Sequence, residues 1–296
     1  MTYFSSGDSL GNMPPGAIAA YLMEVGNLDD ARHFQQGAIS GQSFLSLKKP
    51  YSHSGFILGF IPEATRGAAN TGTILGTSQI EGDKALVGTR IKVSLDKFYV
   101  CNYPGLGQHT VLCEFAGKNQ VPGETEELRF ALRFQNNDRA SAAVSGVPIF
   151  MGVTVGEDGI SFEGRTINVS SSLDDVILST LDTPAFKNGL ALLANAQPAL
   201  KPFSSLAAAA VSTTLKRKQN KQVHNFNLGL DFAKGASSAR LRLGSYVVVQ
   251  SDDVAGWNWD NFEWNRDTHM IEFKANKADP VPFNFMVFGV ARFSDK

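Results

Sequence analysis

Residues 128–134 read Leu-Arg-Phe-Ala-Leu-Arg-Phe, and this stretch decides the fold class. Apolar side chains stand at every second position, and arginines occupy two of the three positions between them. A period of two is typical of a β-strand that has one face on a core and the other in water. The stretch therefore predicts a half-buried strand.

The same alternation recurs on both sides of this stretch, at 91–95 and at 149–155. No helical pattern separates these strands, and turn residues such as those at 121–123 lie between them. Strands that follow one another directly pair antiparallel and form a sandwich or a barrel. We therefore predict a mainly β protein with an antiparallel β-sandwich over 85–171.

Three further regions complete the predicted domain organisation: N-terminal helices, strands and a loop over 1–84, a helical connector over 172–220, and a C-terminal β region over 221–296. In the first region we expect helices at 17–23 and 28–36, strands at 44–47 and 56–61, and a long surface loop over 65–84. In the last two we expect helices from Ser172 to before Pro184 and over 204–215, then strands at 226–232, 246–249, 270–273 and 283–287. Two architectures stay open, a C2-like sandwich and two packed β subdomains.

Composition narrows the function classes. The formal net charge is −1, so no global basic field attracts nucleic acid. The N-terminus has neither a basic start nor an apolar segment, so we expect no signal peptide and a cytoplasmic location. The two cysteines, Cys101 and Cys113, are expected to be small buried thiols.

One acidic stretch, residues 252–267, holds all three tryptophans of the chain: Trp257, Trp259 and Trp264. Five acids accompany them: Asp252, Asp253, Asp260, Glu263 and Asp267. We call this stretch the Trp loop. Tryptophan anchors interfaces and ligand pockets. We therefore predict a non-enzymatic binding or assembly module without a cofactor, whose contact residues are Trp257, Trp259, Trp264, Asp260 and Glu263. The alternative is a connection whose aromatic side chains fill the end of the sandwich.

Acids of this kind also bind calcium, which takes six to eight oxygen ligands from loops. The residues available for such a site are Asp96, Asp252, Asp253 and Asp260. The EF-hand spacing is absent, and no pair of histidines has metal-ligand spacing. We therefore predict no metal site.

A second function class is a membrane-acting effector. Across residues 188–215 the only charged side chain is Lys201, and a basic cluster follows: Lys216, Arg217, Lys218 and Lys221. Such a segment could insert while the cluster contacts anionic headgroups. The alternative is a helical layer that packs on the sheets.

A third class is a hydrolase built on Cys101 and His109, which lie eight residues apart around a Pro-Gly turn. Nucleophilic catalysis requires that such a pair be within hydrogen-bond reach. No phosphate-binding, nucleophile-elbow or dinucleotide motif is present in the sequence, so we assign no catalytic residue.

Overall fold

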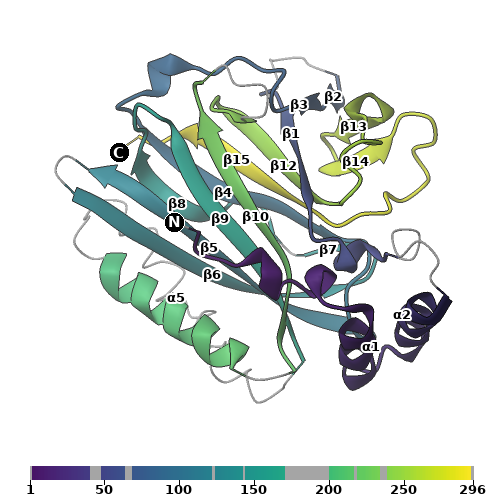
Figure 1. Cartoon of the computed structure of the whole chain (residues 1–296). Coiled ribbons are helices and arrows are strands. Elements are labelled where there is room, and N and C mark those ends of the chain that lie inside the picture. Colours follow the sequence, from purple (N-terminus) through teal and green to yellow (C-terminus); the bar gives the residue numbers. More distant parts are fainter. Residues whose placement is uncertain are drawn as a thin grey trace.

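The stretch 128–134 lies in strand β6 (Glu124–Asn137) of the computed structural model (Figure 1). The structure describes residues 2–40, 48–63, 69–121, 124–142, 144–170, 200–216, 219–233 and 239–294. Strand β6 pairs antiparallel along its length with β5 (Gln108–Val121). Leu128, Phe130, Leu132 and Phe134 are buried, so the strand predicted from alternation is confirmed.

The β5–β6 hairpin belongs to a five-stranded sheet in the order β11-β10-β9-β5-β6. Its other strands are β9 (Ile160–Val169), β10 (Lys221–Asp231) and β11 (Ala239–Arg240). All neighbours pair antiparallel except β10 and β11.

The second sheet has seven strands in the order β3-β1-β12-β15-β4-β7, with β8 also paired to β4. Its strands are β1 (Phe56–Ile61), β3 (Leu75–Gly76), β4 (Arg90–Val100), β7 (Ala140–Ser141), β8 (Val147–Thr154), β12 (Gly244–Gln250) and β15 (Phe285–Arg292). All its pairings are antiparallel, and they join strands from the N-terminal, middle and C-terminal parts of the chain.

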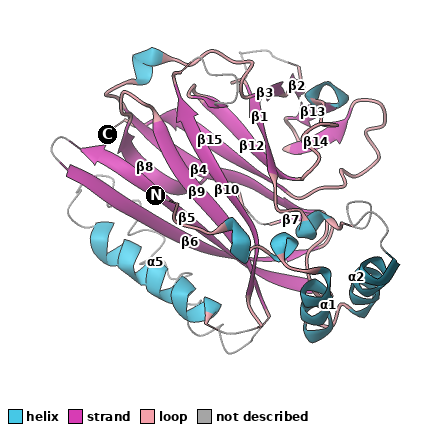
Figure 2. Ribbon diagram, in the orientation of Figure 1, coloured by secondary structure: helices cyan, strands magenta, loops and turns pink. Residues whose placement is uncertain are grey.

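The two large sheets contact each other through phenylalanine rings. The ring of Phe288 on β15 lies 5.7 Å from Phe115, 5.5 Å from Phe162 and 5.5 Å from Phe226, centroid to centroid. These three partners belong to β5, β9 and β10 of the other sheet. The protein is thus mainly β with antiparallel sheets, as predicted, and the contacts between its sheets are consistent with a sandwich (Figure 2).

A small third sheet, in the order β14-β13-β2, contributes to a second apolar cluster. Its strands are β2 (Thr71–Thr73), β13 (Phe262–Asn265) and β14 (Met270–Phe273). Val247, Val249 and Val287 of the large sheet are buried in the same cluster. The seven-stranded sheet therefore has apolar side chains covered on both faces.

Within the described ranges, three α-helices lie at the periphery of the sheets. Helices α1 (Pro15–Glu24) and α2 (Leu28–Ser40) pack on each other, and α5 (Leu200–Leu215) runs along β6 (Figure 1). Gly26 ends α1 with a φ of +82°, a conformation that glycine adopts without strain. Because α5 covers the edge strand β6, it limits pairing of that edge with another chain.

The N-terminal segment crosses the outer face of the five-stranded sheet. The backbone N–H groups of Tyr3 and Phe4 donate to Oε2 of Glu163, at 2.8 and 3.1 Å. The guanidinium of Arg165 lies 4.4 Å from the Phe4 ring centroid and also pairs with the buried carboxylate of Glu114. Glu114 and Glu163 on this face are consequently buried although they are acidic.

Most of the elements predicted from the sequence are present. The helices at 17–23, 28–36 and 204–215 and the strands at 56–61, 226–232, 246–249, 270–273 and 283–287 overlap observed elements. The surface loop expected over 65–84 is wrong for its described part, which contains β2, β3 and the buried Ile74 and Ile80. The strand expected at 44–47 and the helix from Ser172 lie outside the described residues.

Candidate functional site

Trp257 and Trp259 of the Trp loop are half-buried and contact each other. Their ring centroids lie 5.2 Å apart in an edge-to-face arrangement, and Trp257 also stacks on Phe262 at 5.2 Å. Nε1 of Trp259 donates to the carbonyl oxygen of Leu58 at 3.1 Å. The two rings therefore attach the Trp loop to strand β1 while each keeps part of its surface in contact with solvent.

Trp264 has a different environment. It lies on β13, is 8% exposed, and stacks on the His269 ring with the centroids 6.1 Å apart. Residues 253–256 of the Trp loop are exposed, and Val254 is 68% exposed. Trp264 is thus a core residue, and only two of the three tryptophans lie where a partner could contact them.

Most acids of the Trp loop have partners within the molecule. Glu263 pairs with Nζ of Lys277 at 2.5 Å, and Asp267 accepts a hydrogen bond from Asn70 at 2.8 Å. Asp253 accepts from the Gly256 backbone at 2.9 Å. Asp260 is exposed, and the described residues give its carboxylate no partner. Most acids of the Trp loop therefore hold the loop in its conformation through contacts within the molecule.

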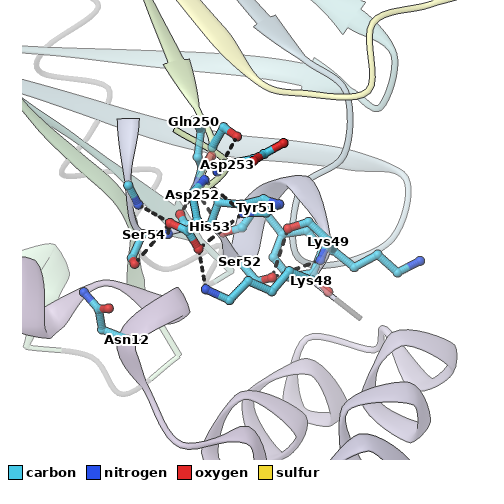
Figure 3. A network of polar contacts seen from close by, with 12 residues as sticks. Asn12, Lys48, Lys49, Tyr51, Ser52, His53, Ser54, Gln250, Asp252 and Asp253 are labelled. Carbon is cyan, nitrogen blue, oxygen red and sulfur yellow. Dashed lines mark hydrogen bonds and ion pairs between the residues drawn. The ribbon is translucent and has the colours of Figure 1, made fainter. Parts of the chain in front are cut away.

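Asp252, the first residue of the Trp loop, is the centre of a polar network (Figure 3). Its Oδ1 accepts hydrogen bonds from the backbone N–H groups of Ser54, at 3.0 Å, and Gly55. Its Oδ2 pairs with Nζ of Lys48. The backbone N–H of Asp252 donates to Nδ1 of His53 at 3.2 Å. The network ties residues 48–55 to the end of β12.

The charges in this network are set by its surroundings. Burial alone would raise the pKa of Asp252, but hydrogen bonds from Lys48 and the Gly55 backbone hold it below the ordinary value. Burial lowers the pKa of His53, whose Nδ1 already accepts a hydrogen bond. Behind them, buried His224 donates from Nε2 to the carbonyl oxygen of Gly55 at 3.1 Å, and burial lowers its pKa to about 4. The Asp252 carboxylate thus has a structural role, because it connects residues 48–55 to the end of β12.

The other sequence-based candidates are separate from this network. Asp96 lies on β4 and accepts a hydrogen bond from Ser94, and no group of three or more His, Cys, Asp or Glu side chains within the described ranges could hold a metal ion. In the basic cluster, Lys216 directly follows α5 and Lys221 begins β10, whereas Arg217 and Lys218 fall outside those ranges.

The segment proposed for membrane insertion falls into two parts. Residues 188–199 lie outside the described residues, and residues 200–215 form α5, whose Ala207 and Val211 are buried. Of the helices that the structure describes, none has the length and apolarity to cross a bilayer.

The cysteine of the hydrolase hypothesis is not placed for catalysis. Burial raises the pKa of the Cys101 thiol, which is the opposite of what an activated thiolate requires. Cys101 packs against the second apolar cluster, and among the described residues the hydrogen-bond partner of the His109 ring is the Asp138 carboxylate, not a thiol.

His109 instead lines a pocket of about 290 Å³ between the end of α1, the turn before β5 and the end of β9. The polar residues of the lining are Gln108, His109, Thr110, Asn168 and Ser170. The apolar part comes from Val25, Pro104, Leu106 and Val169, beside Gly105. We call this site the His109 pocket.

Two side chains of the His109 pocket are held rigidly. Nε2 of His109 lies 3.0 Å from Oδ1 of Asp138, which also accepts from the Tyr103 backbone at 2.9 Å. Nδ2 of Asn168 donates to the Tyr21 hydroxyl and to the Pro104 carbonyl oxygen, both at 2.9 Å. Such fixed polar groups in a concave site are typical of ligand pockets.

Sequence reasoning noticed His109 but missed Asp138 and Asn168. Asp138 lies 29 residues from His109 and reaches it because β5 and β6 pair in a register that sets His109 opposite Asn136. Neither residue belongs to a spacing motif. The alternation in β6, which predicts a strand there, is the sequence feature that points to this region.

We compared the chain with known proteins at three levels. No protein-family model, no curated protein and no solved structure matches it.

Proposed function

We propose that this chain is a non-enzymatic binding protein that holds a small polar molecule in the His109 pocket. The observation that carries the proposal is the His109 ring, which lines a pocket with amide and hydroxyl side chains and is held in place by Asp138. Its Nε2 is taken by Asp138, and the described residues offer no partner for Nδ1. A well-formed pocket with a few convergent polar groups is the most common form of a small-molecule site.

The test is a fragment screen by NMR on the full-length ¹⁵N-labelled chain. We expect binders whose chemical-shift changes centre on residues 104–110 and 168–170. His109→Gln should remove this binding, whereas His33→Gln, on α2 and outside the pocket, should leave it intact. Binding that survives His109→Gln, or shifts that centre elsewhere, would count against the pocket.

A second candidate function is contact with a protein partner through the Trp loop. Val254 is 68% exposed beside the half-buried Trp257 and Trp259, and Asp260 has no cationic partner among the described residues. Such a surface suits a partner that presents basic side chains, because acids and aromatic rings both attract cations. Titration with an oligolysine peptide should change the tryptophan fluorescence, less so after Asp260→Asn, and an oligoglutamate peptide should not. No difference between the two peptides would refute this candidate.

A further inference from the structure

The described residues that line the His109 pocket carry no charged side chain. Among the described residues that line it there is no Lys, Arg, Asp or Glu. A charged molecule that enters loses part of its hydration, and it gains no opposite charge from the lining in return. The lining therefore favours a neutral ligand.

The His109 ring is oriented as a hydrogen-bond acceptor. A carboxylate accepts hydrogen bonds, so Asp138 places a ring proton on Nε2, and in the neutral ring Nδ1 then carries the lone pair. Asp138 is itself held by the Tyr103 backbone and by Nδ2 of Asn102, at 2.9 and 3.3 Å. A Cβ at Gly105 would lie 3.6 Å from Nδ1, so this nitrogen is next to the turn that lines the pocket.

Asn168 supplies a second acceptor. Both of its amide hydrogens are used, by the Tyr21 hydroxyl and the Pro104 carbonyl oxygen, so the amide cannot rotate without losing two hydrogen bonds. Its Oδ1 is then the polar atom that remains for a ligand. A molecule bound here must donate hydrogen bonds to both acceptors.

The size of the pocket limits the ligand further. Its volume of about 290 Å³ lies just below the range for ligand sites, about 300–1,000 Å³. The apolar side chains of Pro104 and Leu106 supply contact for a ring or a short carbon skeleton. These dimensions suit a single ring rather than a drug-sized molecule.

We infer that the His109 pocket selects neutral, polyhydroxylated molecules of about one sugar ring, with Asp138 as the positioning residue that keeps His109 an acceptor. This inference rests on the proposed function, because it names the ligand class of the same pocket. A carboxylate analogue would meet the lone pairs of His109 and Asn168 without a cation nearby. An ammonium analogue would find acceptors but no carboxylate in the lining.

The ligand class is tested with the full chain and a matched set of compounds: neutral monosaccharides and polyols, their uronates and their amino-sugar analogues. We expect saturable binding of a neutral member that is at least about tenfold tighter than that of its charged analogues, as the loss of one or two hydrogen bonds to a fixed acceptor implies. Tighter binding of a uronate or an amino sugar in the pocket overturns the ligand class but not the proposed function. If neither these compounds nor the fragment screen gives a binder, both the ligand class and the proposed function are refuted.

The role of Asp138 has its own readout in the free protein. The ¹⁵N shifts of the His109 ring should report a proton on Nε2 and a lone pair on Nδ1. Asp138→Asn should mix the two tautomers and weaken the neutral ligand about tenfold, whereas the exposed Asp267→Asn should change neither. A proton on Nδ1 in the unaltered chain overturns this assignment whatever the compounds do.

Discussion

Acid should destabilise this protein through His224, a residue of β10 that is buried between the sheets. Its Nε2 donates to the carbonyl oxygen of Gly55, and its ring lies 6.0 Å from that of Phe226. Burial lowers its pKa from 6.5 to about 4, while Asp252 raises it and His53 lowers it by smaller amounts. The folded protein therefore holds this side chain neutral.

The magnitude follows from the two pKa values. Above the unfolded pKa both states are neutral at this residue, so His224 adds no pH dependence. As the pH falls from about 6.5 to about 4, the unfolded chain binds a proton that the folded chain does not, and the free energy of unfolding decreases. Because a tenfold change in a proton equilibrium corresponds to about 1.4 kcal/mol, the full loss is about 3 kcal/mol.

The assay is urea unfolding at several pH values between about pH 7 and about pH 4, with His224→Gln as the variant and His33→Gln as the control. The glutamine amide can still donate to Gly55 but binds no proton. We expect the unaltered chain and the control to lose about 3 kcal/mol more than the His224→Gln variant over this range. His53 also has a lowered pKa and contributes equally to all three chains. Parallel pH profiles for the variant and the unaltered chain would refute the buried, neutral His224.

Three substitutions test the packing by urea unfolding at neutral pH. Phe226→Ala removes a ring that fills the core between the sheets, so the free energy of unfolding should fall by about 3–5 kcal/mol, and a near-normal stability would refute the inward register of β10. Gly55→Ala should cost about 1–3 kcal/mol, because a Cβ would lie 2.9 Å from Oδ1 of Asp252; an unchanged midpoint would contradict the network. Trp259→Ala should lower the free energy of unfolding by about 2–4 kcal/mol, because the ring packs so closely on Gly59 that a Cβ there would lie only 2.6 Å from it. An unchanged stability would show that the Trp259 ring does not anchor the Trp loop.

Alternation predicted strand β6, whose arginines face outward, and failed for strand β9. Strand β9 reads Ile-Ser-Phe-Glu-Gly-Arg-Thr-Ile-Asn-Val and was not predicted, because it has few alternating apolar residues. Its Glu163, Thr166 and Asn168 are nevertheless buried. The reason is long-range: the N-terminal segment covers Glu163, and helix α1 covers Asn168 through Tyr21. The alternation rule assumes that one face of a strand is in contact with solvent. It cannot predict that a segment about 150 residues away in the sequence buries this face.

The Trp loop shows a second limit of sequence-based prediction. Composition correctly marked it as unusual, and three aromatic rings among five acids suggested a binding surface. In the structure, Trp257 stacks on Phe262 and Trp259 bonds to Leu58, so much of this aromatic surface joins the third sheet to the large one. A residue list cannot distinguish the two uses, because both require large rings with a polar edge.

The His109 pocket is tied to the fold through the hydrogen bonds of Asn168. Asn168 lies near the end of β9, and its amide reaches both the Tyr21 hydroxyl on α1 and the turn at Pro104. Burial raises the pKa of Tyr21 to about 12, so this hydroxyl stays protonated and accepts through its lone pair at neutral pH. Helix α1 therefore orients the acceptor that the pocket presents, while Asp138 orients the other from the β5–β6 hairpin. In the proposed site, the positions of the two acceptors therefore depend on how α1 and the β5–β6 hairpin pack around the end of β9.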